Sequence, residues 1–365
     1  MFFVVVAIFF LFCFSKAITL KDIEANYGVL FLGEERMLDI SSIFTHRLRQ
    51  KILRENLQFI ETENSKNHTY LLGVTRFIYL SQDEFIHMTT LRGYIATTGM
   101  MKRSTHSNCE VPFSTQSVDW RKKGIFSPIR NQGTCGSCYG EAAAELTASV
   151  LRLSGKRVDQ LSLQQIVDCS RSYGNSGCSG GSILFSMKYI MDNGLVTEAN
   201  YPYIGKTGEC NISGSTRYQV HNSTTLVGVS ESVIQRYVSQ SPVAVGMLSS
   251  WAPLQHYRSG VLSGNCHGAI DHAVLIVGYG EMYTQTNEAI PYWILRNSWG
   301  YDWGEGGYFR LERNTGGLGM CEIGTTVSLA VAYCICYKQI TRLEYYDEYI
   351  SLLILAHLYS KNTFS

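Results

Sequence analysis

The sequence predicts an α+β protein in which a helical segment precedes a strand-rich segment, with a further helical region at the N-terminus. Helix-forming runs occupy residues 142–153, 162–169 and 183–193. From about residue 223 onward, runs of β-branched and aromatic residues take over, and glycine-rich turns such as 304–307 separate them. Strands are expected at residues 243–248, 272–279, 292–296 and 308–312.

The composition is that of an ordinary globular protein. The chain has 365 residues, of which 45% are hydrophobic and 17% charged, and its formal net charge is +1. This length is enough to build one or two large cores. The balanced charge gives no reason to expect a nucleic-acid partner.

The eleven cysteines indicate an oxidising compartment. Residues 1–17 are expected to be a secretory signal peptide, because 2–14 form an apolar run too short to span a bilayer comfortably and Ser15 and Ala17 are small. The protein is therefore expected in the secretory pathway, either secreted or lysosomal, without a membrane span. Three Asn-X-Ser/Thr sequons mark candidate glycosylation sites at Asn67, Asn211 and Asn222.

The region before residue 113 contains one clear helix. Leu53, Leu57 and Ile60 recur at helical spacing within residues 45–64, which predicts an amphipathic helix, although any solvated helix can show this pattern. Residues 99–113 are rich in Gly, Ser and Thr, and we expect an exposed linker there.

A glycine-rich turn leads into the helix at 142–153 and ends in Cys138. Ser137 is a suitable N-cap and Gly155 a suitable C-terminal stop, so Cys138 is expected in the first helical turn. Free N–H groups and the helix dipole there stabilise a thiolate, the nucleophilic form of cysteine. Gln132 can donate an amide N–H toward the same point. Cys135 and Cys138 also form a CxxC pair, which alone could be a redox pair or half of a zinc site.

Two later segments place polar side chains at the ends of predicted strands. His272 follows Asp271 at the head of a buried strand, and Asn297 ends another strand, just before Ser-Trp299-Gly. Such a histidine is more often structural, and an Asn-Ser-Trp-Gly corner is usually only a turn. Together with Cys138, the two residues complete the set needed for nucleophilic catalysis by a cysteine.

These three segments, in the order Cys, His, Asn, resemble those of the papain family and its cathepsin L-like branch, including the signature Cys-Gly-Ser-Cys-Tyr. The resemblance covers roughly residues 40–332. Upstream, the sequence is similar to cathepsin L-type propeptides at Arg49, Asn56, Ile60 and Asn64, whereas Thr45 and Leu53 replace the Glu and Phe of that pattern. Residues 73–79 resemble the motif Gly-x-Asn-x-Phe-x-Asp, with Thr75 and Tyr79 in place of Asn and Asp.

The resemblance implies a papain-like two-domain fold, with a helical left domain and a β-barrel-like right domain, behind a helical N-terminal propeptide. It divides the chain into a signal peptide at 1–17, an inhibitory propeptide at 18–113, a peptidase domain at 114–332 and an extension of unknown role at 333–365. Residues 117–124 resemble the start of mature enzymes, so propeptide cleavage is expected between Pro112 and Gln116.

The implied function is that of a cysteine endopeptidase made as a zymogen. Cys138 would attack the peptide carbonyl as a thiolate, and His272 would pair with it and then protonate the leaving amine. Asn297 would orient the imidazole beneath Trp299, and Gln132 would form the oxyanion hole with the Cys138 backbone N–H. No metal or cofactor is needed. The implied partners are protein or peptide substrates, the enzyme's own propeptide and cystatin-type inhibitors, with the enzyme itself a monomer.

The resemblance also implies the disulfides and the substrate-binding positions. The expected pairs are Cys135–Cys178, Cys169–Cys210 and Cys266–Cys321, which leave Cys138 free. The substrate positions are Ser182, Ile183, Gly246, Ile270 and Thr326, together with Gly180, Gly181 and Trp299. The first five offer no carboxylate and Gly246 leaves room, so a bulky apolar side chain is expected at P2, two positions N-terminal to the cleaved bond. No His-His occluding insertion is present, which favours endopeptidase activity.

Three residues depart from the family pattern: Tyr139 replaces Trp, and Gly140 and Glu141 replace Ala and Phe. Glu141 follows Cys138 by one helical turn, so it either faces the thiolate and raises the pKa of Cys138 and His272, or turns to solvent and is screened. Two other function classes remain open. One is a catalytically inactive binding protein, and the other is a CxxC oxidoreductase, which requires Cys135 to pair with Cys138.

Overall fold

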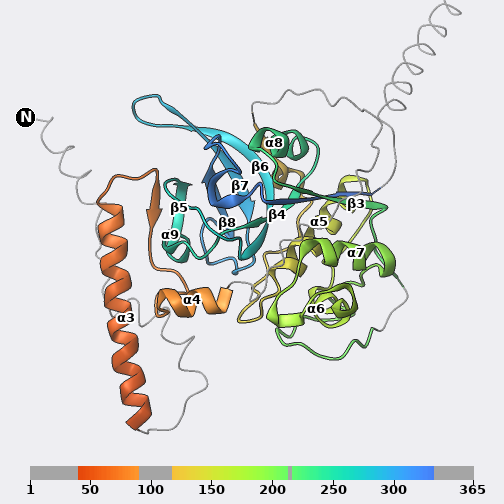
Figure 1. Ribbon diagram of the computed structural model, residues 1–365, viewed down its shortest axis with the longest axis horizontal. Coiled ribbons are helices and arrows are strands. Elements are labelled where there is room, and N and C mark those ends of the chain that lie inside the picture. Colours follow the sequence, from red (N-terminus) through yellow and green to blue (C-terminus); the bar gives the residue numbers. More distant parts are fainter. Residues whose placement is uncertain (1–39, 90–116, 213–215, 333–365) are drawn as a thin grey trace, which may run out of the picture.

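The computed structural model describes residues 40–89, 117–212 and 216–332 (Figure 1). The predicted signal peptide, linker, cleavage region and C-terminal extension lie outside these residues. The helices are α3 Ile40–Asn64, α4 Gln82–Thr89, α5 Cys138–Leu153, α6 Leu163–Cys169, α7 Ile183–Asn193, α8 Glu231–Val238 and α9 Ala252–Gln255, with 3-10 turns η2 Trp120–Lys123, η3 Arg171–Tyr173, η4 Gly177–Ser179 and η5 Met320–Glu322. The strands are β1 Tyr70–Leu72, β2 Val118–Asp119, β3 Asn222–Val227, β4 Val243–Met247, β5 Tyr257–Leu262, β6 His272–Tyr283, β7 Ala289–Arg296, β8 Tyr308–Glu312 and β9 Thr326–Val331.

The described strands join into one nine-stranded sheet. Its order is β1-β5-β8-β7-β6-β4-β9-β3, and β2 pairs with β6 off this path. Neighbouring strands are antiparallel except for the parallel pair β5 and β8. Because β1 and β3 lie at opposite ends of the order, the sheet is open, and the expected β-barrel-like closure is wrong. The α+β class itself is confirmed, since α5, α6 and α7 lie together to one side of the sheet (Figure 1).

Strand β6 contributes side chains to two hydrophobic cores, one on each face of the sheet. Its side chains alternate between the two faces, as in any strand. Ala273 and Leu275 pack into the hydrophobic cluster built with α5 and α7. Val274 and Ile276 pack into a second cluster, which also contains side chains from α8 and from the region of α3 and α4. The residues ahead of β2 thus contribute to a core of the peptidase part and are not merely attached to its surface.

Helix α5 is buried along most of its length, from Cys138 to Leu151. Gly140 has a packing role there, because a Cβ at this position would lie 2.8 Å from Cδ1 of Leu163 and 3.1 Å from Cγ2 of Ile166. The glycine therefore allows α6 to approach α5 closely. This gain offsets the roughly 1 kcal/mol of helix stability that a glycine costs.

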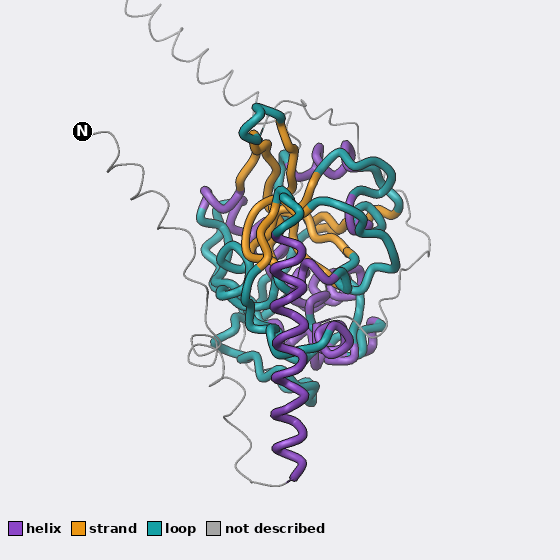
Figure 2. Tube along the Cα trace, turned by 90° about the vertical axis from the view of Figure 1, so that its left-hand side faces the viewer, coloured by secondary structure: helices purple, strands orange, loops and turns teal. Residues whose placement is uncertain are grey.

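The N-terminal region is held together by hydrogen bonds from α3. Asn56 Nδ2 donates to the carbonyl oxygens of Ile78 (2.7 Å) and Leu80 (2.9 Å). Asn64 donates to the carbonyl of Leu72 and accepts from its N–H, both at 2.9 Å. The residues that match the propeptide pattern therefore fix the segment between α3 and α4. Helix α3 extends past the rest of the described residues at one end in both views (Figures 1 and 2).

Strand β1 links this region to the peptidase part by adding to the edge strand β5. Tyr70 pairs with Gly260 and Leu71 with Ser259 in antiparallel register. Gly260 has φ +92°, and a Cβ there would lie 2.4 Å from the carbonyl oxygen of Thr69. Main-chain hydrogen bonding of this kind covers an otherwise open sheet edge.

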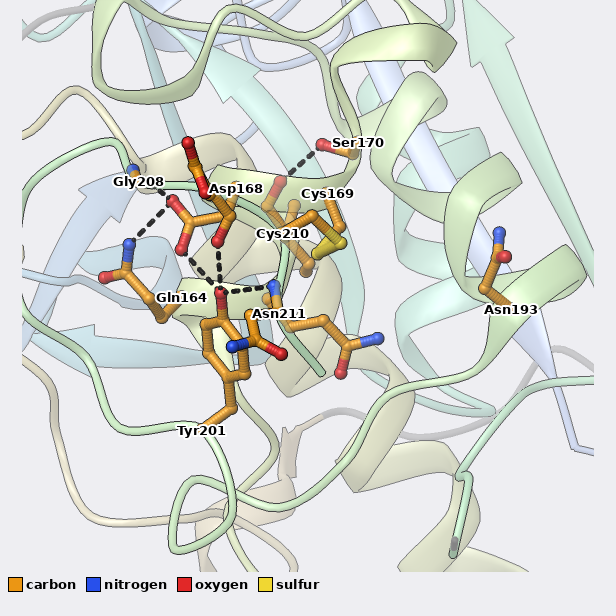
Figure 3. The surroundings of a disulfide bond; sticks show 12 residues. Gln164, Asp168, Cys169, Ser170, Asn193, Tyr201, Gly208, Cys210 and Asn211 are labelled. Carbon is orange, nitrogen blue, oxygen red and sulfur yellow. Dashed lines mark hydrogen bonds between the residues drawn. A yellow bond between two sulfur atoms is a disulfide. The ribbon is translucent and has the colours of Figure 1, made fainter. Parts of the chain in front are cut away.

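The described residues contain three disulfides, with the same pairings as the resemblance implies: Cys135–Cys178, Cys169–Cys210 and Cys266–Cys321. Beside the second, the Asp168 carboxylate accepts from Gly208 N (2.7 Å), Tyr201 Oη (2.9 Å) and Gln164 Nε2 (3.0 Å), which fixes the loop after α7 (Figure 3). Among the described residues Cys138 is the free cysteine. None of the described helices has the length and apolarity needed to cross a membrane.

Candidate active site

Cys138 is the first residue of α5 and is fully buried. The expectation that Ser137 caps this helix with its side chain is wrong, because its hydroxyl makes no cap hydrogen bond. Instead, Ser137 Oγ lies 2.8 Å from Tyr203 Oη. The backbone still places Cys138 in the first turn, where the N–H groups of a helix are free to favour negative charge.

His272 and Asn297 meet although they are 25 residues apart in the sequence. His272 Nε2 lies 2.8 Å from Asn297 Oδ1. The same oxygen accepts from the backbone N–H of Ser298 at 2.8 Å, which identifies it as the oxygen of the amide. His272 Nε2 must therefore donate and carry the proton. Nδ1, which has no hydrogen-bond partner among the described residues, is left as the basic nitrogen.

Trp299 covers this contact. Its ring centroid lies 4.9 Å from that of His272, with an interplanar angle of 31°. Phe77 and Phe85, from the N-terminal region, pack edge-on against the same indole at 5.6 and 5.3 Å. The histidine–asparagine bond is thus enclosed by aromatic rings contributed by two separate parts of the protein.

Gln132 is anchored near the start of α5. Its Oε1 accepts from Ser298 Oγ at 2.6 Å, and its backbone N–H donates to the carbonyl of Ser298 at 2.9 Å. Since Oε1 is fixed by a hydroxyl, Nε2 must be the donor end, and one of its hydrogens goes to Cys135 O at 3.1 Å. The amide nitrogen therefore lies beside the turn that precedes Cys138, with a second N–H still available.

Burial controls the ionisation of the cysteine and the histidine. It raises the pKa of the Cys138 thiol to about 12, against the opposing effect of the backbone N–H groups of Ala273, Tyr139 and Cys138. Burial also lowers the pKa of His272, while its bond to Asn297 acts in the opposite direction. Neither group favours a charge of its own. A proton that passed from the thiol to the imidazole would create two opposite charges that stabilise each other, so we expect the two groups to ionise together.

Glu141 does not turn to solvent, so that expectation is wrong, and its carboxylate is instead engaged in an ion pair. Its side chain is buried and forms an ion pair with Arg130 Nη1 at 2.5 Å. Arg130 Nη2 also pairs with Glu198 at 3.0 Å and donates to the carbonyl of Leu161. Burial is the largest effect on the Glu141 carboxyl and raises its pKa, while the charge of the Arg130 guanidinium acts to lower it.

The comparisons with known proteins agree with this geometry. A family model described as "Papain family cysteine protease" matches residues 114–331. The chain belongs to the papain family of cysteine proteases. It is 38% identical over 301 residues to cysteine proteinase COT44 of Brassica napus, covering 78% of this chain and 88% of that protein. It is 36% identical to germination-specific cysteine protease 1 of Arabidopsis thaliana, covering 78% and 77%.

Solved structures of papain-family proforms share the fold. The proform of the ragweed pollen allergen Amb a 11 superposes with a TM-score of 0.72 at 26% identity, covering 86% of this chain and 94% of that one. Digestive procathepsin L 3 of Tenebrio molitor gives 0.69 at 32% identity, covering 80% and 94%. This papain-family protease is thus a peptidase with a propeptide, as the sequence predicted.

Five of the positions implied for substrate binding in this papain-family protease lie at the start of α7, in β4, at the start of β9 and just before β6. Ile183 belongs to the same hydrophobic cluster as Cys138, and Gly246 pairs with Ala273 next to the histidine. Ser182 is the N-cap of α7, its hydroxyl accepting from Leu184 N, so this hydroxyl is already engaged. Thr326 begins β9, beside β4, and Ile270 precedes β6. Gly180 and Gly181 are also buried, and a Cβ on Gly181 would lie 2.8 Å from the ring of Tyr139.

The departures from the family pattern have local explanations. Tyr139 Oη donates to the carbonyl of Gly177 at 2.9 Å, which satisfies its buried hydroxyl.

Of the predicted sequons, Asn67 and Asn211 are exposed, whereas Asn222 is half-buried at the start of β3 and its Oδ1 accepts from Ser223 N. Sequence reasoning missed Ser298, although it lies inside the Asn-Ser-Trp segment that was singled out. It also missed Tyr203 and Arg130, for which no local pattern gave a signal.

Proposed function

We propose that this papain-family protease is an endopeptidase that uses Cys138 as nucleophile and His272 as base and acid, and that it is made as a zymogen. The observation that carries the proposal is the bond from His272 Nε2 to Asn297 Oδ1. This bond leaves Nδ1 as the basic nitrogen. His272 is the first residue of β6 and pairs with Met247 of β4. The backbone N–H of the next residue, Ala273, hydrogen-bonds to Cys138 and lowers the pKa of its thiol.

The mechanism balances protons within the pair. The Cys138 proton moves to Nδ1 of His272, and the thiolate sulfur attacks the substrate carbonyl carbon. The developing oxyanion is stabilised by the Cys138 backbone N–H and the second N–H of Gln132 Nε2. His272 then gives its proton to the leaving amine as the C–N bond breaks. Water hydrolyses the resulting thioester in the same way, with His272 as the base, and returns the thiol.

A preference for a bulky apolar side chain at P2 belongs to the same proposal. Ile183, Ile270 and Gly246 offer apolar surface and space, and the five predicted pocket positions include no carboxylate. A buried cationic side chain would have no ionic partner there and would be penalised by desolvation. Arginine at P2 should therefore be a poor choice.

We also propose passage through the secretory pathway, with glycosylation at the exposed Asn67 and Asn211. Three disulfides in the described residues support this route, because such bonds persist in oxidising compartments. The half-buried Asn222 is the weakest acceptor of the three sequons. Treatment of the secreted protein with an endoglycosidase, followed by mass measurement, tests each site.

Active-site titration tests the catalytic proposal. The papain-family inhibitor E64 occurs bound to bromelain of Ananas comosus, which is 31% identical to this protein, with 60% of this chain and all of that one covered (TM-score 0.55). One equivalent of E64 should abolish hydrolysis of a peptide with Leu at P2 and label Cys138. The Cys138→Ser variant should neither react nor hydrolyse. Peptide binding without turnover by the unmodified mature enzyme would instead support the inactive binding protein.

A further inference from the structure

Arg76, in the propeptide segment between β1 and α4, reaches across to the peptidase part of the protein. Its Nη1 donates to the carbonyl oxygen of Trp299 at 3.0 Å. Its Nε lies 3.5 Å from Oδ2 of Asp302. The Arg76 side chain is only 19% exposed, whereas that of Asp302 is 46% exposed. A propeptide guanidinium is therefore seated between a main-chain carbonyl and a carboxylate of the peptidase part.

The residue between these two acceptors is shaped to receive a guanidinium. A Cβ on Gly300 would lie 2.6 Å from Arg76 Nη1 and 2.9 Å from Asp302 Oδ1, so any larger residue would take the space that the guanidinium occupies. Gly300 also has φ +87°, a conformation that favours glycine. Its N–H donates to Arg130 O at 3.1 Å, which fixes the corner. A guanidinium offers only donors in a planar fork and so suits two converging acceptors.

The position of this corner relative to the catalytic residues determines which part of a substrate it can meet. The Trp299 ring lies tilted against that of His272, the residue proposed to protonate the leaving amine, with the ring centroids 4.9 Å apart. That amine belongs to the substrate residue immediately C-terminal to the cleaved bond. We therefore assign the corner formed by Trp299, Gly300 and Asp302 to the C-terminal side of the cleaved bond.

The peptidase part supplies no cation of its own to this carboxylate among the described residues. Arg258, the nearby arginine of β5, donates to the main-chain oxygen of Asp302 at 3.2 Å rather than to its carboxylate. Arg76 is the ion-pair partner that the described structure gives to Asp302. Removal of the propeptide thus exposes two acceptors that were occupied by an arginine.

We propose that the corner of Trp299 O, Gly300 and Asp302 is a substrate subsite for the guanidinium group of an arginine located C-terminal to the cleaved bond, and that Arg76 occupies it in the proenzyme. This rests on the proposed endopeptidase function and adds a second determinant of specificity to it. Arginine is preferred over lysine, because a compact ammonium cannot reach both acceptors with a planar fork. In this way the propeptide blocks the site with the side chain that the site selects.

Peptide hydrolysis by the mature enzyme tests the subsite. Quenched fluorescent peptides with Leu at P2 carry Arg, Lys or citrulline at each of the first three positions after the cleaved bond, and mass spectrometry confirms the cleavage point. Citrulline keeps the shape of arginine without its charge. At one of the three positions, kcat/KM should be about three- to tenfold higher for Arg than for citrulline. This is the gain expected from a charge-assisted hydrogen bond to a partly exposed carboxylate. This ratio should fall toward one in high salt.

Asp302→Asn should bring the ratio of Arg to citrulline close to one. Asp159→Asn, which removes an exposed carboxylate elsewhere, should keep it. Should Asp302→Asn fail to fold, the salt dependence of the ratio in the unmodified enzyme decides the matter. Equal rates for Arg and citrulline at all three positions, or a preference that survives Asp302→Asn, would overturn the subsite and leave Arg76 as a contact of the propeptide alone. Absence of turnover on every peptide, including the neutral ones, would instead overturn the peptidase function and with it the subsite.

Discussion

The oxygen of Asn297 settles which nitrogen of His272 is basic. Because the Ser298 N–H and the His272 ring N–H both donate to this oxygen, the proton stays on Nε2 and the ring plane is held. Without the amide, the ring can turn or change tautomer, and Nδ1 is no longer held as the basic nitrogen. In the proposed mechanism, orientation by Asn297 therefore acts on every step that uses His272.

Asn297→Ala should lower kcat by about 100-fold, the low end of what general acid–base catalysis contributes, with a smaller change in KM. Initial rates with a P2-Leu peptide, normalised to E64-titrated sites, measure both constants. Asn200→Ala, at an exposed asparagine away from the site, is the matched control and should keep both values. Full activity of Asn297→Ala would remove Asn297 from the proposed machinery.

Glu141 illustrates the limit of sequence reasoning at the residue scale. Cys138, His272 and Asn297 were identified because each lies in a short recognisable segment. The partner of Glu141 is Arg130, eleven residues before it, and Glu198 completes the cluster from much further along the sequence. Helical spacing correctly put Glu141 one turn after Cys138, but the direction of its side chain depends on a tertiary contact that periodicity does not encode.

Replacing Glu141 with Met should destabilise the protein by about 3–5 kcal/mol, because Arg130 would stay buried without its main counter-charge. Urea unfolding in a Cys138→Ser background, which prevents self-digestion, measures the change. The double variant Arg130→Met/Glu141→Met should recover much of the loss. Glu55→Met, which breaks the exposed pair with Lys51, should change stability by less than about 1 kcal/mol. Equal effects of Glu141→Met and Glu55→Met would contradict the buried pair.

At the scale of elements, the contact between α3 and α4 carries an acid-sensitive link. Arg49 Nη1 donates to Glu84 Oε2 at 2.6 Å and to Tyr79 O at 3.1 Å. Tyr79 stands where the family motif has Asp, so its own side chain supplies no carboxylate. The hydrogen bond from Arg49 is the main reason why the pKa of Glu84 lies below its ordinary value of 4.5. The link therefore contributes stability above that ordinary value and loses it as the pH falls through the lowered pKa.

Glu84→Gln should speed propeptide release at pH 5–6 by about two- to fivefold, consistent with the loss of a partly exposed ion pair, and should flatten the acceleration expected in stronger acid. Gel analysis of purified proenzyme over a pH series measures the rate. Asp83→Asn, which removes the neighbouring exposed carboxylate, serves as the control. Parallel pH profiles for Glu84→Gln and the unmodified proenzyme would place the acid response elsewhere.

For the whole molecule, the sequence predicted the class and order of the elements better than their assembly. The helix at Ile183–Asn193 and the strand at Tyr308–Glu312 lie where local patterns placed them. The open sheet was not foreseen, because closure depends on which edge strands pair, and β1 comes from the propeptide to occupy the edge of β5. The contact of Arg76 with Asp302 could not be predicted either, since the two residues are far apart in the sequence.

The contact of the propeptide with Trp299 should govern latency. Phe85 is fully buried, 5.3 Å from the Trp299 ring and 5.1 Å from that of Phe77, so α4 sits on the indole that covers His272. Phe85→Ala removes this packing, at a cost of about 3–5 kcal/mol if the site cannot collapse. The uncleaved Phe85→Ala proenzyme should then react with E64 at least tenfold faster than the unmodified proenzyme at neutral pH.

Intact-mass measurement shows how much E64 label is on the full-length protein, so labelling of the proenzyme is distinguished from labelling that follows propeptide cleavage. Leu48→Ala, at an exposed position of α3, should leave the labelling rate unchanged. Residue 85 lies in the predicted propeptide, so the mature enzymes from both proenzymes should be identical in sequence and equally active, which checks that the variant folded. A labelling rate unaffected by Phe85→Ala would mean that access to Cys138 is controlled by another part of the propeptide and not by the cover over Trp299.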